Sequence, residues 1–161
     1  MTSVALELYR HKTWATRQLI EFLRGLPEAT LDLTTPGTYG SIRATLAHLA
    51  NNEAGYYAFI TEQELPEPLP HTASLDEASE RIEQYAPLWE RLLDDPGLPE
   101  RNLVHPRGSA LAVVPMSQAI HHGDVHRTHI LSILGAQGLE VPDLDIWDYA
   151  TSAGQLQPSS T

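Results

Sequence analysis

Residues 116–134 read MSQAIHHGDVHRTHILSIL, and this stretch decides where the fold and its chemistry lie. At about 100° per residue, His122, His126 and His129 fall on one side of a helix. Apolar residues extend the same side toward both ends of the segment, which is typical of a face that points into a core. The stretch therefore predicts a helix that carries three histidines into the interior of the protein.

Three earlier segments show helical periodicity, and each has boundary signals of its own. The first covers about 3–26. The second covers about 42–63 and follows Ser41, a suitable N-cap residue. The third begins after a capping box over 74–77 and ends before the turn at Asp95. The sequence therefore predicts four helices.

The other segments are less regular. Pro87, inside the third segment, predicts a kink or an early end to that helix. Residues 101–114 are the least helical, and the valines at 113–114 suggest a short extended piece before Pro115 opens the fourth helix. Residues 143–149 suggest a short docking turn or helix.

Four amphipathic helices around one core predict an all-α fold, a four-helix bundle of antiparallel helices with room for a short extra C-terminal helix. The connection between the second and third helices is long enough for a crossover. Residues 1–154 are expected to form a single domain, and residues 155–161 a polar C-terminal tail.

Composition excludes several classes of function. The 161 residues include 10 Lys+Arg and 21 Asp+Glu, a formal net charge of -11, and such a surface repels phosphate backbones and anionic lipid. We therefore expect no nucleic-acid or membrane partner. The absence of cysteine excludes disulfides, a thiolate metal site and a cysteine nucleophile. No apolar stretch reaches membrane-spanning length and no signal peptide is visible, so a cytoplasmic protein is expected.

The spacing of His122 and His126 allows both imidazoles to reach one divalent ion at about 2.0–2.1 Å. A water-filled polar core or a solvated histidine cluster would show the same spacing. A bundle usually completes such a site from a facing helix, and His48, in the apolar sequence ATLAHLA, is the natural candidate. His11 is the next candidate, although a structural role suits it better. His71 and His105 fall in predicted loops, so both are interpreted as surface residues.

The segments SIRATLAHLA (41–50), IHHGDVHR (120–127) and WATR (14–17) resemble those of the DinB-like (DinB/YfiT) metalloenzymes. The resemblance spans nearly the whole chain. It implies a four-helix bundle, often a homodimer, in which three histidines from the second and fourth helices hold a divalent ion. By position these ligands are His48, His122 and His126.

His129 departs from the family pattern, which more often has Gln there. It is interpreted as a donor that orients a ligand imidazole, with an alternative role as a ligand itself. Asn52, one helical turn from His48, would orient a ligand or a substrate, or would form a helix–helix hydrogen bond. Arg127 would bind an anionic cofactor carboxylate, or pair with a carboxylate on a neighbouring helix.

Three neutral imidazoles leave an ion with an open coordination position, the pattern of catalytic sites. The resemblance implies thiol chemistry, because characterised relatives include transferases that depend on low-molecular-weight thiols and a thiol-using maleylpyruvate isomerase. The expected function is thus a metal-dependent transferase. The ion, which could be Zn, Ni or Fe, would activate an external thiol for attack on a small electrophilic substrate.

Two alternatives remain open at this point. One is a hydrolase that uses metal-bound hydroxide and a nearby general base, for which Glu53 is the candidate. The competing interpretation of Glu53 is an ion pair with Arg17 or Arg127. The other alternative is a non-catalytic dimeric module, metal-stabilised, with a binding or stress-response role.

Overall fold

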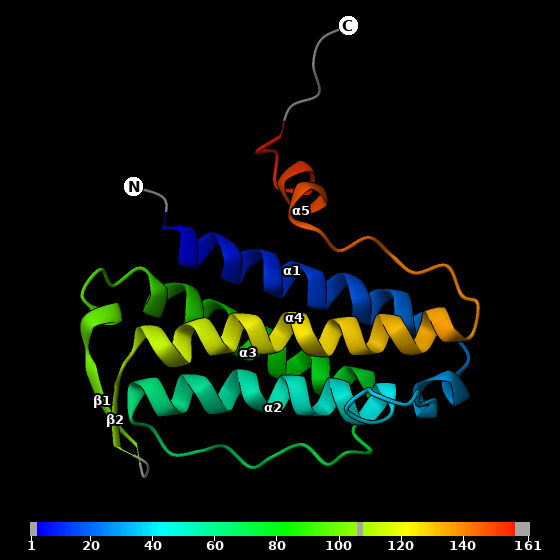
Figure 1. The fold of residues 1–161 in the computed structure, drawn as a ribbon, viewed down its shortest axis with the longest axis horizontal. Helices are drawn as coiled ribbons and strands as arrows, with labels where there is room; N and C mark the ends of the chain where they lie inside the picture. Colours follow the sequence, from blue (N-terminus) through cyan, green and yellow to red (C-terminus); the bar gives the residue numbers. More distant parts are fainter. Residues whose placement is uncertain (1–2, 106–107, 157–161) are drawn as a thin grey trace, which may run out of the picture.

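The computed structural model describes residues 3–105 and 108–156 and contains four long helices packed side by side (Figure 1). The predicted all-α bundle with a short extra C-terminal helix is confirmed. The long helices are α1 (Val4–Arg24), α2 (Ile42–Thr61), α3 (Leu75–Leu93) and α4 (Val113–Ala136). The smaller elements are two 3-10 helices (Glu28–Asp32 and Leu98–Glu100), the strands β1 (Asn102–His105) and β2 (Gly108–Leu111), and α5 (Ile146–Ser152).

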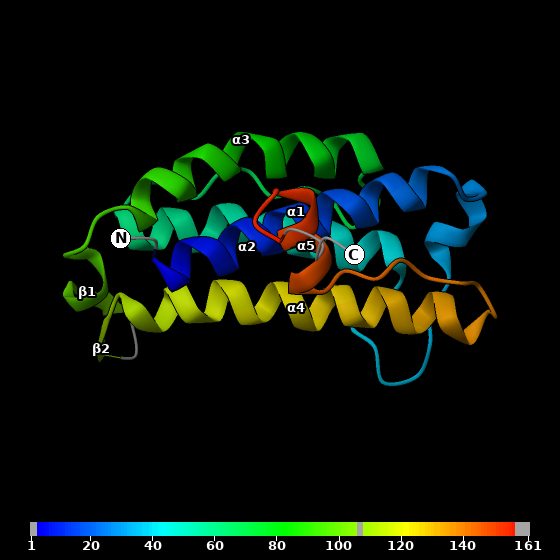
Figure 2. The ribbon, with the colours of Figure 1, turned by 90° about the horizontal axis from the view of Figure 1, so that it is seen from above.

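The sequence predicts that neighbouring helices are antiparallel, but two neighbouring pairs run parallel. Helices α1 and α2 each pack against both α3 and α4. Helix α2 runs parallel to α3, and α1 runs parallel to α4 (Figures 1 and 2). The connection from α2 to α3 returns along the length of the bundle (Figure 1), so the crossover that its length allows is present. As a result, α2 and α4 lie antiparallel and face each other.

The predicted caps explain where two helices begin. The hydroxyl of Ser41 accepts a hydrogen bond from the backbone N–H of Ala44 at 3.1 Å, which fixes the start of α2. Ser74 and Glu77 form the complete capping box of α3. Helix α3 continues through Pro87 rather than ending early, and its ribbon bends along its length (Figure 2).

The segment before α4 differs from the prediction. Val113 and Val114 form the first helical residues of α4, not an extended piece. Pro115 is tolerated two residues inside the helix, because the first N–H groups of a helix have no carbonyl partner in any case. The extended structure lies earlier, in the antiparallel hairpin of β1 and β2, where Val104 pairs with Ser109.

The spacing of the first segment predicts one interior stripe, formed by Val4, Leu8, His11, Ala15, Leu19, Phe22 and Leu26. The buried face of α1 is rotated from this stripe. Val4, at the start of that stripe, is 75% exposed, and Leu8 is only half-buried. The interior face instead includes Lys12 and Thr16 between apolar residues. His11, in the middle of that stripe, packs near Tyr149 of α5, whereas Ala15 and Leu19 remain in the core. None of the described helices is both long enough and apolar enough to cross a membrane.

Candidate metal centre

Three of the predicted side chains meet between α2 and α4. His48, His122 and His126 each offer one ligand nitrogen, and these nitrogens all lie within 4.8 Å of one another. The Nε2 atoms of His48 and His122 are 2.9 Å apart. The ring centroids are separated by 4.9 Å for His48–His122, 4.7 Å for His48–His126 and 4.2 Å for His122–His126. His126 is buried and the other two are half-buried.

The geometry follows from helical spacing and helix packing. His122 and His126 lie four residues apart on α4, so their side chains project from the same face. That face packs against α2, and the small residues Ala44 and Ala47 flank His48 on its own helix. One imidazole from α2 therefore enters the space between two imidazoles of α4.

All three imidazoles are held in the neutral form that a metal requires. Burial is the main cause that lowers the pKa of His122 to about 3, and nearby His126 and His48 lower it further. Burial, followed by His48 and His129, lowers the pKa of His126 to about 4. The pKa of His48 is also lowered, chiefly by burial. At neutral pH each ring therefore keeps a lone pair for a cation.

These residues fit a divalent ion. Imidazole nitrogens suit Zn, Ni and Fe, and two Nε2 lone pairs directed at each other are unfavourable unless a proton or a cation lies between them. Nδ1 of His126 is buried, and among the described residues it has no hydrogen-bond partner. A divalent ion shared by the rings would satisfy the facing nitrogens together.

Tyr39, in the loop before α2, covers the exposed side of His48. Its hydroxyl lies 3.1 Å from Nδ1 of His48, and the two rings stack with centroids 4.2 Å apart. Its ring also meets the edge of His126 at 5.0 Å. Sequence reasoning missed Tyr39, because a single aromatic residue in a turn-rich loop gives no periodic signal.

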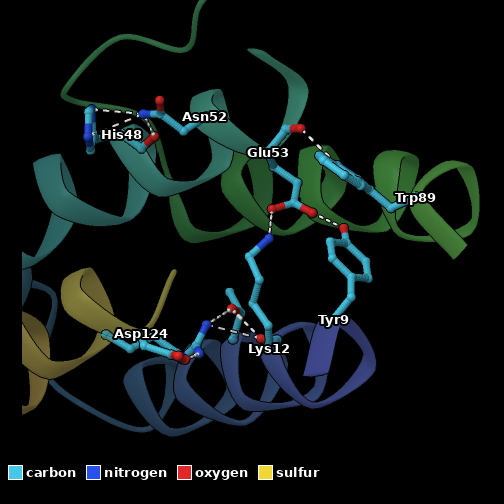
Figure 3. Close-up of polar contacts among 9 residues, drawn as sticks. Tyr9, Lys12, His48, Asn52, Glu53, Trp89 and Asp124 are labelled. Carbon is cyan, nitrogen blue, oxygen red and sulfur yellow. Dashed lines mark hydrogen bonds and ion pairs between the residues drawn. The ribbon is translucent and has the colours of Figure 1, made fainter. Parts of the chain in front are cut away.

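Asn52 lies against His48 on the same helix, as its spacing implied. Its side-chain Nδ2 donates to the backbone oxygen of His48 at 2.8 Å and lies 3.2 Å from both ring nitrogens (Figure 3). The helix–helix hydrogen bond considered for Asn52 is not found among the described residues. Asn52 thus contributes to the position of the imidazole.

His129 lies beside the cluster but outside it. Its ring is 5.4 Å from that of His126, edge to face. It does not belong to the group of nitrogens within reach of one ion, and its buried Nδ1 has no hydrogen-bond partner among the described residues. The interpretation of His129 as an alternative ligand is therefore not supported by this arrangement.

The other histidines lie apart from the cluster. Nε2 of His11 is 2.7 Å from the backbone oxygen of Leu144, so His11 has the structural role expected of it. His121 is exposed on another side of α4, and His71 is exposed in the connection before α3. His105 is predicted to lie at the surface, and its side chain lies outside the part of the chain that the structure describes.

The partner predicted for Glu53 is wrong. Its carboxylate is buried and bonds with the ammonium of Lys12 and the hydroxyl of Tyr9 (Figure 3). Arg17 instead pairs with Glu83 on α3. The reason is the rotation of α1, which turns Lys12 inward and Arg17 outward. Burial raises the pKa of Glu53 and lowers the pKa of Lys12. The pair belongs to the core and is not part of the histidine cluster.

Arg127 also differs from the prediction. It is buried and bonds with Asp124 on its own helix rather than with a carboxylate on a neighbouring one. Its Nη1 donates to the backbone oxygen of Lys12 and to the hydroxyl of Thr16, each at 3.1 Å. The guanidinium therefore joins α4 to α1 through these contacts.

Fold and cluster together define an all-α bundle protein with a candidate three-histidine metal centre between two of its helices. The chain belongs to the DinB family, whose sequence pattern matches residues 1–96. The matched residues include His48 but end before α4, so the structure alone brings the histidines of α4 to His48. A comparison with curated proteins found no match.

Proposed function

We propose that the protein is a metal-dependent transferase that uses a low-molecular-weight thiol. His48, His122 and His126 would hold a divalent ion, and the thiol would attack a small electrophilic substrate. The observation that carries the proposal is the donor set: three neutral imidazoles converge, and no carboxylate of the described chain joins them. A site of this kind leaves coordination positions for an external ligand.

The chain's own residues hold and orient the centre in this proposal. The three imidazoles are neutral because burial lowers each pKa, so they would leave the full charge of the ion in place. Tyr39 and Asn52 would fix the ring of His48. A divalent ion, when bound, would supply a lowered pKa for a coordinated thiol, which is then a thiolate at neutral pH.

The sulfur must come from solution, because the chain contains no cysteine. With chlorodinitrobenzene as the electrophile, sulfur forms a bond to the ring carbon and chloride leaves with the bonding electron pair. The thiol proton passes to solvent. No protein nucleophile is required for this reaction.

A hydrolase is less well supported. Its general base was expected to be Glu53, but that carboxylate is bonded to Lys12 and Tyr9 in the core. No other Asp or Glu of the described chain lies in the group formed by the three histidines. Attack by metal-bound hydroxide would therefore lack the neighbouring carboxylate that zinc peptidases use.

The proposal is tested with purified protein loaded with Zn²⁺, Ni²⁺ or Fe²⁺. Chlorodinitrobenzene is supplied with 2-mercaptoethanol, cysteine or glutathione, and thioether formation is followed by absorbance. We expect turnover only when metal and thiol are both present, and loss of turnover in His48→Ala. The proposal fails if no combination exceeds the uncatalysed rate, or if chelator-treated protein is equally active.

Chelation also tests the non-catalytic alternative. An ion that served only to stabilise the bundle would leave an unfolded protein when removed. In contrast, the two apolar core clusters include none of the three histidines. We expect the far-ultraviolet circular dichroism of the chelated protein to keep most of its helical signal.

A further inference from the structure

A pocket of about 720 Å³ is lined by residues of α2, β2 and α4. The hairpin of β1 and β2 stands at one end of the bundle, beside α2 and α4 (Figure 1). The walls of the pocket come from the second half of α2, from β2 and from the first turns of α4. A pocket of this volume is within the range that encloses a drug-sized molecule. The function proposed above does not yet use it.

The lining is apolar, with a few uncharged polar groups. Tyr56, Phe59, Val114 and Pro115 supply apolar surface, while Asn52 and Gln118 supply amide groups. None of the described residues that line the pocket carries a charge. A charged group that entered would meet no counter-charge on these lining residues, and an anion would also meet a chain of net charge -11.

The pocket borders the histidine cluster through two shared residues. Asn52 lines the pocket and also contacts the ring of His48. Tyr56 lines it as well, and its ring meets the edge of His122 with centroids 5.9 Å apart. A molecule in the pocket would therefore have one end beside the centre and its other end toward the hairpin.

We propose that this pocket binds an uncharged, mainly apolar molecule with aromatic or aliphatic surface, anchored by the amides of Asn52 and Gln118. The inference that this molecule is the electrophile of the transferase rests on the proposed function. The inference that the pocket binds such a molecule does not. Aromatic and apolar walls with few polar groups select ligands by shape and by exclusion of charge. The ligand class is thus neutral and apolar rather than a carboxylate or a phosphate.

Gly55 is a position at which an added side chain would enter the pocket. A Cβ added at Gly55 would meet no atom within 4 Å, although the residue lines the pocket from the middle of a helix. A larger side chain there would fill the pocket without a clash against the core. Gly135 is a matched control, because it also lies in a helix and its added Cβ would meet nothing within 4 Å. It is about 25 Å along α4 from Gln118 at 1.5 Å per residue.

The test is a fluorescence titration of metal-free protein with two probes that share one ring system. N-phenylnaphthylamine is neutral and anilinonaphthalene sulfonate is anionic. We expect saturable binding of the neutral probe to the wild type, and binding of the sulfonate weaker by about tenfold or more. Gly55→Leu should weaken binding of the neutral probe by about tenfold or more, and Gly135→Leu should leave it unchanged within about twofold.

The inference is overturned if the neutral probe does not bind, if the sulfonate binds equally well, or if both glycine variants behave alike. Because the titration uses neither metal nor thiol, its outcome is independent of the transferase assay. Probe binding without turnover would support the pocket as a binding site and contradict the proposed transferase. Turnover that is unaffected by Gly55→Leu, together with failed probe binding, would support the transferase and overturn the pocket.

Discussion

The hydroxyl of Tyr39 lies 3.1 Å from Nδ1 of His48, whereas Nε2 of the same ring lies 2.9 Å from Nε2 of His122. If Nε2 binds an ion, Nδ1 carries the proton and donates it to the Tyr39 oxygen. The nearby amide nitrogen of Asn52 is itself a donor and cannot accept that proton. The Tyr39 oxygen is therefore the acceptor for this tautomer, in which Nε2 is free to bind the ion.

Tyr39→Phe should weaken metal affinity by about 10-fold or more, because contacts of this kind typically change affinity by 10–100-fold. The stacked ring is kept, so only the oxygen is lost. Affinity is measured by competition with a chromophoric chelator. Tyr149→Phe is the control, since it removes a hydroxyl bonded to Glu7, away from the cluster. Equal affinities in the two variants would show that the hydroxyl does not orient His48.

His122→Ala should abolish stoichiometric metal binding, because two imidazoles from different helices rarely hold an ion alone. Elemental analysis of purified protein measures the metal content. His121→Ala is a matched control, since His121 is the adjacent residue of α4 and is exposed outside the cluster. Retained metal in His122→Ala would require the ligand set to be redrawn.

Gly123→Ala should destabilise the fold by about 1–3 kcal/mol. An added Cβ would lie 2.8 Å from Cε and 3.0 Å from Cγ of Lys12, and that side chain cannot move freely because it is buried against Glu53. Gly135→Ala, with open space around its Cβ, should instead stabilise by about 1 kcal/mol through helix propensity. Denaturant unfolding of both variants gives the comparison, and equal effects would contradict the close packing.

Glu53→Gln should cost about 3–5 kcal/mol, because it leaves the buried ammonium of Lys12 without its charged partner. Replacement of both residues, in Lys12→Met with Glu53→Leu, should recover much of that loss. Glu83→Gln is the control, since its pair with Arg17 is exposed and contributes less than about 1 kcal/mol. Similar losses of unfolding free energy in Glu53→Gln and Glu83→Gln would show that the buried pair contributes no more to stability than the exposed one.

The metal-free protein should lose stability as the pH falls below about 6.5. The pKa of His122 is about 3 and that of His126 about 4 in the folded protein, against 6.5 for an ordinary histidine. The unfolded chain therefore takes up these protons first, which favours unfolding. Denaturant unfolding between pH 7 and pH 5 should show this slope, and His122→Gln should show a smaller one. An identical slope in the variant would mean that His122 is not neutralised by burial.

Local patterns in the sequence predicted the parts of the site that lie on one helix. The spacing of His122, His126 and His129 placed all three on one side of α4, and the caps at Ser41 and Ser74 fixed two helix starts. His48 required a second argument, from its apolar neighbours and from the family resemblance. These signals work because helical geometry repeats every few residues.

The parts that were missed depend on tertiary packing. The rotation of α1 decides that Lys12, and not an arginine, meets Glu53, and no sequence period reports a buried charge. Tyr39 reaches His48 through a loop, and the pocket needs the hairpin to stand beside Gly55.

The expected homodimer stays a prediction.

The two helices that form the centre are made at different times. His122 follows His48 by 74 residues, with the crossover, α3 and the hairpin between them. A ribosome therefore exposes the first imidazole long before the last long helix has been synthesised. An ion held by all three rings therefore requires α4 to have been made, and a truncated product that ends before α4 would contain only His48 of the three ligands.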